Sequence, residues 1–112
     1  MEQLEAAIEE AADGTVVHVE GEIDLANAPK LAELLGPLRT SEEPVTVDLA
    51  DVTFIDSTGL HALLEFATHS LNGNGPLRIA NPSRTVLRVM DIVGMTQLAH
   101  IQVQVSNDEQ HG

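Results

Sequence analysis

The sequence predicts a single α/β domain in which a mixed, mostly parallel β-sheet packs against about three main helices. Short apolar segments typical of strands alternate along the 112 residues with longer segments of helical period. Two strands joined by a tight turn precede this alternation, so the expected order is β-β-α-β-α-β-α-β. The length fits one domain over residues 1–112, with residues 106–112 as a polar tail.

The first two segments predict an antiparallel hairpin. Residues 4–11 alternate apolar and polar side chains, although their Glu and Ala content favours a helix. Asp13-Gly14 is a strong turn signal, and residues 15–20 (Thr-Val-Val-His-Val-Glu) have the composition of a strand. We therefore expect residues 4–11 to pair with residues 15–20, and residues 21–24 to end the second strand.

The segment after the hairpin predicts the first helix. Four leucines recur at helical spacing, namely Leu31, Leu34, Leu35 and Leu38. Either Asp24 or Asn27 is expected to cap this helix, because both side chains accept hydrogen bonds from free backbone N–H groups. Gly36-Pro37 should end the helix near Leu35 or distort it.

The middle of the chain predicts the central strand and the second helix. Residues 45–49 form an apolar run typical of a buried strand. A helical face then begins at Leu60 and runs to a Gly- and Asn-rich loop at residues 72–76. Residues 77–80 are expected to form the next strand.

The last third of the chain predicts one more helix and one more strand. Ser83 should cap the third helix, and Gly94 should end it. Its apolar face is expected to carry Val86, Leu87, Met90 and Val93. Residues 101–105 alternate apolar and polar side chains and predict the final strand.

Composition and charge exclude several classes of function. The net charge of −13, from 18 acidic and five basic residues, disfavours nucleic acids and anionic membranes and favours basic protein surfaces as partners. No apolar run approaches the length of about 18 residues that a membrane span needs. The chain has no cysteine and its acidic N-terminus lacks a signal-peptide pattern, so we expect a cytoplasmic protein.

The most reactive side chains lie at the expected start of the second helix, in the segment Asp56-Ser57-Thr58-Gly59. A hydroxyl there is expected either to cap the helix or to accept a phosphate, which the free N–H groups and the dipole of a helix N-terminus can hold. Gly59 would let a partner's backbone or a nucleotide approach. Asp56 would orient or deprotonate the hydroxyl, or act as a cap, and the spacing of the residues does not separate these interpretations.

Other kinds of reactive site find little support in the sequence. His61 lies four residues after Ser57, but Ile55 occupies the first glycine position of the Gly-x-Ser-x-Gly pattern of hydrolases. His61, Glu65 and His69 are spaced by four residues, yet the His-Glu-x-x-His pattern is absent, so we expect an exposed polar stripe and no metal site. No P-loop or Gly-x-Gly-x-x-Gly pattern occurs, and we expect no cofactor.

Three motifs resemble the bacterial anti-sigma-factor antagonists of the STAS domain family. Residues 56–60 (Asp-Ser-Thr-Gly-Leu), placed after a buried strand, resemble the family's signature. Residues 21–24 with 28–31 resemble its first strand-to-helix junction, and residues 90–95 (Met-Asp-Ile-Val-Gly-Met) resemble the end of its third helix. The motifs follow the family's order and spacing within residues 14–105. His61 departs from the small residue that often follows Gly-Leu in the family.

This resemblance implies a STAS-like fold and a regulator that is a substrate and switch, not an enzyme. In the family, the unphosphorylated antagonist binds an anti-sigma factor, itself a serine kinase of GHKL type, and thereby frees a sigma factor. The kinase phosphorylates the serine after the aspartate, here Ser57, with Thr58 as a minor alternative, and a PP2C-type phosphatase reverses this. The implied partner-binding residues are Asp24, Asn27, Asp56, Ser57, Thr58, Gly59 and His61.

Two other classes of function stay open on the sequence alone. The chain would be a scaffold or accessory STAS subunit of a signalling or lipid-transport complex, since such proteins share the fold. Alternatively, it would be a module that binds a nucleotide at the same helix N-terminus. Large assemblies in size-exclusion chromatography would indicate the scaffold, and heat on titration with ATP or GTP alone would indicate the nucleotide-binding module.

Overall fold

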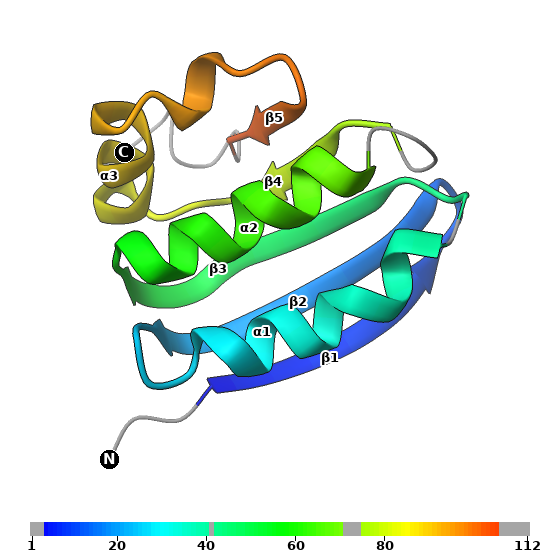
Figure 1. The fold of residues 1–112 in the computed structure, drawn as a ribbon, viewed down its shortest axis with the longest axis horizontal. Coiled ribbons are helices and arrows are strands. Elements are labelled where there is room, and N and C mark those ends of the chain that lie inside the picture. The colour runs from blue at the N-terminus through cyan, green and yellow to red at the C-terminus, as the bar shows by residue number, and fades with distance from the viewer. Residues whose placement is uncertain (1–3, 41, 71–74, 106–112) are drawn as a thin grey trace.

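A five-stranded sheet with its main helices on one face forms the domain (Figure 1). The computed structural model describes residues 4–40, 42–70 and 75–105, so the tail at 106–112 and most of the loop at 72–76 lie outside the described residues. The strands are β1 (Leu4–Ala11), β2 (Gly14–Ile23), β3 (Val45–Ile55), β4 (Leu77–Ala80) and β5 (Ile101–Gln104). The helices are α1 (Ala28–Leu35), α2 (Ser57–Ser70) and α3 (Arg84–Ile92), with short 3₁₀ helices η1 (Gly36–Thr40) and η2 (Met95–Gln97).

The strands lie in the sheet in chain order, β1-β2-β3-β4-β5. The pairing of β1 with β2 is antiparallel, and every later pair is parallel, which confirms the predicted mixed sheet and the order of elements. Two parallel neighbouring strands must be joined by a crossover connection. When all the crossovers have the same hand and each leads to the next strand in the same direction across the sheet, their helices lie on the same face. Figure 1 shows α1 and α2 side by side across that face.

One element boundary differs markedly from the prediction: the central strand continues past residue 49 to Ile55. The second strand ends at Ile23, within the predicted residues 21–24, and α2 begins at Ser57, within the segment expected to start it. The physical reason for the longer central strand is strand pairing: β2 and β3 stay paired, through two register shifts, up to Ile23 and Ile55. Tertiary pairing therefore extends strand structure through polar residues that local propensity assigned to a loop.

The core lies between the sheet and the helices. Its largest fully buried side chains include Phe66, Ile23, Leu31, Leu35, Leu49, Leu63, Leu77, Ile79 and Met90. Each such side chain contributes roughly 1.5–3 kcal/mol by leaving water. Within α3 only Val86 and Met90 are buried, so the prediction that Val93 belongs to the apolar face of this helix was wrong. Val93 follows the last helical residue and is 56% exposed.

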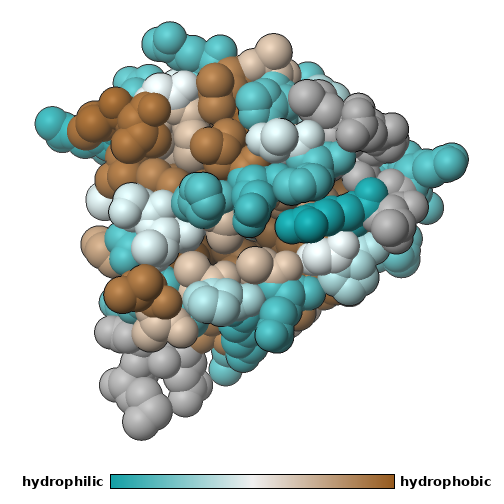
Figure 2. Space-filling model, in the orientation of Figure 1, coloured by the Kyte–Doolittle hydropathy of each residue, from teal (hydrophilic) through white to brown (hydrophobic). Residues whose placement is uncertain are grey.

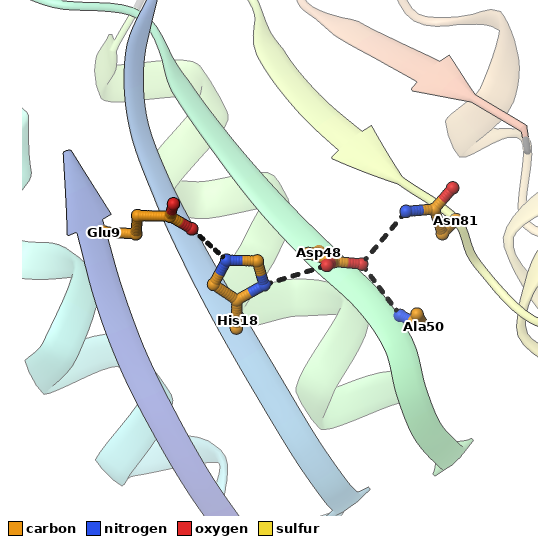
Figure 3. A network of polar contacts seen from close by, with 5 residues as sticks. All are labelled: Glu9, His18, Asp48, Ala50 and Asn81. Atoms are coloured by element: carbon orange, nitrogen blue, oxygen red, sulfur yellow. Dashed lines mark hydrogen bonds and ion pairs between the residues drawn. The ribbon is translucent and has the colours of Figure 1, made fainter. Parts of the chain in front are cut away.

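Polar side chains occupy the sheet face opposite the helices (Figure 3). His18 on β2 lies between two carboxylates, with Nε2 2.7 Å from Oε1 of Glu9 and Nδ1 2.9 Å from Oδ2 of Asp48. A carboxylate oxygen accepts but cannot donate, so both hydrogen bonds form only when the ring carries both protons. The hydrogen bond with Glu9 and then that with Asp48 raise the pKa of His18 above its ordinary value of 6.5.

We expect His18 to make the stability of the sheet depend on pH. Because folding raises the pKa of His18, its contribution to folding stability is complete at pH values below the unfolded-state pKa near 6.5. The contribution is lost as pH rises through the folded-state pKa. The side chains of His18 and Glu9 are exposed and water screens their charges, so the contribution is under about 1 kcal/mol. Urea unfolding gives the free energy of unfolding at about pH 5.5 and about pH 9, and the difference between the two pH values should be smaller for His18→Gln than for the parent chain. An equal difference in both proteins would contradict this role.

Candidate functional site

Asp56 joins β3 to α2 and caps that helix. Its Oδ1 accepts hydrogen bonds from the backbone N of Thr58 (2.9 Å), the backbone N of Gly59 (3.1 Å) and the Thr58 hydroxyl. Its Oδ2 accepts from the backbone N of Leu25 at 3.2 Å, which attaches the β2–α1 loop to the same carboxylate. The helix cap is therefore Asp56, which is one of the alternatives that the sequence left open, and neither the Ser57 nor the Thr58 hydroxyl provides it.

The hydrogen bonds to Asp56 also set its charge. The bond from the Thr58 hydroxyl, followed by those from the backbone of Gly59, Thr58 and Leu25, lowers the pKa of Asp56 below its ordinary value of 3.8. A base is most effective when its pKa lies near the working pH, so a carboxylate held in its ionised form is a poor proton acceptor at neutral pH. Asp56 also makes no hydrogen bond to the Ser57 side chain, and its geometry supports capping and not deprotonation.

We expect Asp56→Ala to destabilise the fold by about 1–2 kcal/mol, because the cap of α2 and the tie to Leu25 are both lost. Because folding lowers the pKa of Asp56, its contribution to folding stability is complete at pH values above the unfolded-state pKa near 3.8. The contribution is lost as pH falls through the lower folded-state pKa. Urea unfolding at neutral pH measures the loss. Asp51→Ala, which removes an exposed aspartate of β3, is the matched control, and an equal loss in both variants would argue against the cap.

The two hydroxyls of the segment differ in accessibility. Ser57 is the first residue of α2, its side chain is exposed, and its hydroxyl forms no hydrogen bond within the described part of the chain. Thr58 is half-buried and donates its hydroxyl hydrogen to Asp56. Of the two hydroxyls, that of Ser57 is therefore the one open to a reagent or a partner.

Gly59 is required by the packing of α2 on the sheet. A Cβ atom at this position would lie 2.5 Å from Cγ2 of Ile23 and 2.8 Å from Cγ1 of Ile55, and the residue is buried. Such distances are shorter than real carbon–carbon contacts. The absence of a side chain thus lets α2 approach β2 and β3, which corrects the expectation that Gly59 makes room for a partner.

Asp24 and Asn27 hold the β2–α1 loop in shape. Asn27 Oδ1 accepts from the backbone N of Asp24 at 2.8 Å, and its Nδ2 donates to the backbone O of Glu22 at 2.7 Å. Asp24 Oδ1 accepts from the backbone N of Ala26 and of Asn27. Asn27 occupies the cap position of α1, but its side chain makes no capping bond. The two residues instead present Leu25, which is 73% exposed, beside the Asp56 carboxylate.

Two exposed apolar side chains lie close to Ser57. Leu25 belongs to the loop whose backbone bonds to Asp56, and Val93 lines a groove together with Ser57. This groove of about 250 Å³ lies between α2 and the segment after α3, and it is lined by Ser57, Leu60, His61, Leu64, Val93, Gly94, Met95 and Leu98. Figure 2 shows apolar side chains gathered over α3 and the turn that follows it. Exposed apolar surface of this kind is typical of a site for protein docking.

Sequence reasoning brought Ser57 and His61 to this surface but missed its apolar members. Val93 was assigned to the apolar face of α3, and Leu25 was not assigned to any site. The sequence carried no signal for the exposure of Val93, because this residue follows Met90 by three positions and so has the spacing of the buried stripe. Gly94, with φ of 85°, ends α3 as predicted and turns the chain so that Met95 is buried while Val93 stays exposed.

The second helix carries the polar stripe that the sequence predicted. His61, Glu65 and His69 are all exposed, and the Nδ1 atom of His69 lies 2.8 Å from the backbone O of Glu65. Within residues 4–40, 42–70 and 75–105, no three His, Asp or Glu side chains are placed to hold a metal ion. None of the helices in the described ranges has the length and apolar character needed to cross a membrane.

The fold and the site define a small α/β domain with an exposed serine at the start of a helix, beside a mostly apolar groove. The chain belongs to the STAS domain family, whose model matches residues 5–108. It is 33% identical to an anti-sigma-B factor antagonist of Bacillus subtilis, over 79% of this chain and 81% of that protein. It is 39% identical to an anti-sigma-B factor antagonist of Staphylococcus epidermidis, over 76% of this chain and 80% of that protein.

The solved structures agree with this assignment of the fold. An anti-sigma factor antagonist from Mycobacterium paratuberculosis superposes with a TM-score of 0.83 over 96% of this chain and 90% of that chain. The sequence identity is 23%, so the likeness supports the fold, which is the α/β STAS fold that the motifs implied.

Proposed function

We propose that this chain is an anti-sigma factor antagonist whose binding is ended by phosphorylation of Ser57. The names of its relatives in Bacillus and Staphylococcus support the first part. The observation that carries the second part is the Ser57 hydroxyl, which is exposed at the first residue of α2, forms no hydrogen bond within the described residues, and lines a mostly apolar groove. On this proposal the protein is a cytoplasmic regulator that is acted on by enzymes and is not one itself.

The proposed partner is an anti-sigma factor that is also a serine kinase of GHKL type. In the transfer step, Ser57 Oγ attacks the γ-phosphorus of ATP held by the kinase. The new O–P bond forms while the bond from the γ-phosphorus to the β–γ bridging oxygen breaks, and ADP leaves with those electrons. The hydroxyl proton passes to a base of the kinase, because the Asp56 carboxylate is occupied by four hydrogen bonds and has a lowered pKa. A PP2C-type phosphatase is the proposed enzyme for the reverse change.

Phosphorylation would oppose binding by electrostatics alone. A phosphoserine carries about −1.5 to −2 charges at neutral pH. It would stand beside Leu25 and Val93, which a partner must cover, and on a chain whose net charge is already −13. The free N–H groups and dipole at the start of α2 would still accommodate the phosphate in the unbound protein. The modification therefore changes affinity without requiring a change of fold.

The dimensions of the groove favour a protein partner over a nucleotide. At about 250 Å³, lined mostly by apolar side chains, it lies below the roughly 300–1,000 Å³ usual for small-molecule sites. It suits one or two apolar side chains of a partner. Asp24 and Asn27 would contribute by holding the loop that presents Leu25, and His61 would contribute as part of the groove wall.

The direct test of this function is release of a sigma factor. A GHKL-type anti-sigma factor from the same organism is first bound to its sigma factor, and the purified unphosphorylated chain is then added. We expect the sigma factor to be displaced and recovered free by size-exclusion chromatography. Stable co-elution of all three proteins, or no displacement at excess of this chain, would contradict antagonism.

Val93→Glu is expected to weaken binding of the anti-sigma factor by about tenfold or more, because a charge would then line the apolar groove beside Ser57. Val93 is exposed, so the fold should tolerate the change. Val105→Glu is the matched control, since Val105 is also an exposed valine but does not line this groove. Titration calorimetry with the anti-sigma factor compares the two, and an equal loss in both variants would place the interface elsewhere.

A further inference from the structure

We propose that His61 holds the phosphate of phosphorylated Ser57 and so stabilises the switched-off form of the protein. The inference rests on the proposed role of Ser57 as the phosphate acceptor.

The position of His61 on α2 brings it next to Ser57. The two residues are separated by four positions in one helix, which places their Cβ atoms about 5–6 Å apart on the same side. Both side chains are exposed, and both line the groove of about 250 Å³ between α2 and the segment after α3. An imidazole ring and a phosphoserine side chain can each extend across the remaining distance to form a hydrogen bond.

Few other charged groups compete for His61. His61 also lines a second groove, of about 210 Å³, between α1 and α2. In the lining of these two grooves, within the described residues, His61 is the one basic side chain and Glu65 the one acidic side chain. The side chains that α1 and the segment after α3 contribute to the linings are uncharged. The carboxylate of Asp56 is held by its bonds to Thr58, Gly59 and Leu25.

Phosphorylation would change the balance between the two neighbours of His61. Glu65 lies four residues after His61 and offers one negative charge, while the phosphate lies four residues before it and offers up to two. An acidic group that precedes a basic group by four residues is also the more favourable order in a helix. The His61 ring would therefore turn toward position 57 once the phosphate is present, and its N–H donor would favour the doubly ionised phosphate.

The test uses protein in which phosphoserine is incorporated at position 57 during synthesis, so that no kinase is needed. The second ionisation of the phosphate, which lies near pH 6 for an ordinary phosphoserine, is followed by ³¹P NMR. We expect its midpoint to lie about 0.3 units or more higher in His61→Gln than in the parent phosphoprotein. His69→Gln, which removes an exposed histidine from the last turn of the same helix, is the control and should leave the midpoint unchanged.

The outcomes separate this inference from the proposed function. Equal midpoints in the parent and His61→Gln, or equal shifts in His61→Gln and His69→Gln, would overturn the role of His61. A PP2C-type phosphatase should also remove the phosphate faster from His61→Gln, provided that the midpoint has shifted. If the midpoint shifts but no GHKL-type kinase modifies Ser57, the proposed switch fails while the phosphate contact of His61 stands.

Discussion

The Ser57→Glu variant is expected to bind an anti-sigma factor about 100-fold more weakly than the parent chain while keeping the parent's stability. The glutamate places a negative charge in the lining of the apolar groove that includes Val93, and a docked partner would have to remove water from this charge. The fold should not suffer, because the Ser57 hydroxyl forms no hydrogen bond within the described residues. A negative charge in the first turn of a helix is, in addition, favourable.

Titration calorimetry and urea unfolding, applied to the same protein samples, measure both halves of this prediction. Ser57→Ala is the matched control, and it should bind as the parent does because it removes the hydroxyl without adding charge. It should also stay bound when ATP is added, whereas the parent complex should dissociate. Parent-like binding by Ser57→Glu would mean that position 57 lies outside the interface.

The Gly59→Val variant is expected to lose about 3 kcal/mol or more of folding stability. Its Cβ would lie 2.5 Å from Ile23 and 2.8 Å from Ile55, two buried side chains that leave no free volume. Overpacking of this kind costs about 1–3 kcal/mol, and the further methyl groups of valine add to the clash. The loss falls on the contact that fixes the start of α2 against β2 and β3, so partner binding should decline as well.

Gly36→Ala is the control for Gly59→Val, because a Cβ at Gly36 would meet no atom within 4 Å. Its free energy of unfolding should stay within about 0.5 kcal/mol of the parent value. Urea unfolding of the two variants at neutral pH gives the comparison. A Gly59→Val protein as stable as Gly36→Ala would show that α2 is not held at this distance from the sheet.

The sequence predicted the fold because each element has its own period and its own boundary signals. The Asp13-Gly14 signal predicted the hairpin, whose two turn residues are Ala12 and Asp13. Ser83 caps α3 by accepting a hydrogen bond from the backbone N of Val86, as expected. The end of β3 could not be predicted in this way, because its last residues are held by pairing with β2 up to Ile55, which no local pattern contains.

The site shows the same division between local and tertiary information. Asp56, Ser57 and Thr58 are all good cap residues, so the choice of cap depends on where the helix begins, and the pairing of β3 with β2 fixes that point. The exposure of Leu25 and Val93 follows from no sequence period, and Val93 even has the spacing of the buried stripe of α3. Leu25 is exposed because it lies in the loop that is bonded to Asp56, and Val93 is exposed because the chain turns at Gly94 directly after it.

A phosphotransfer assay with the phosphorylated residue mapped tests the central claim most directly. The chain is incubated with a GHKL-type anti-sigma factor and ATP, digested, and analysed by mass spectrometry, alongside Ser57→Ala and Thr58→Ala. The account predicts one phosphate on Ser57, dissociation of the complex as it appears, full modification of Thr58→Ala and none of Ser57→Ala. Phosphate on Thr58 or elsewhere in the parent chain, or undiminished modification of Ser57→Ala, would contradict it.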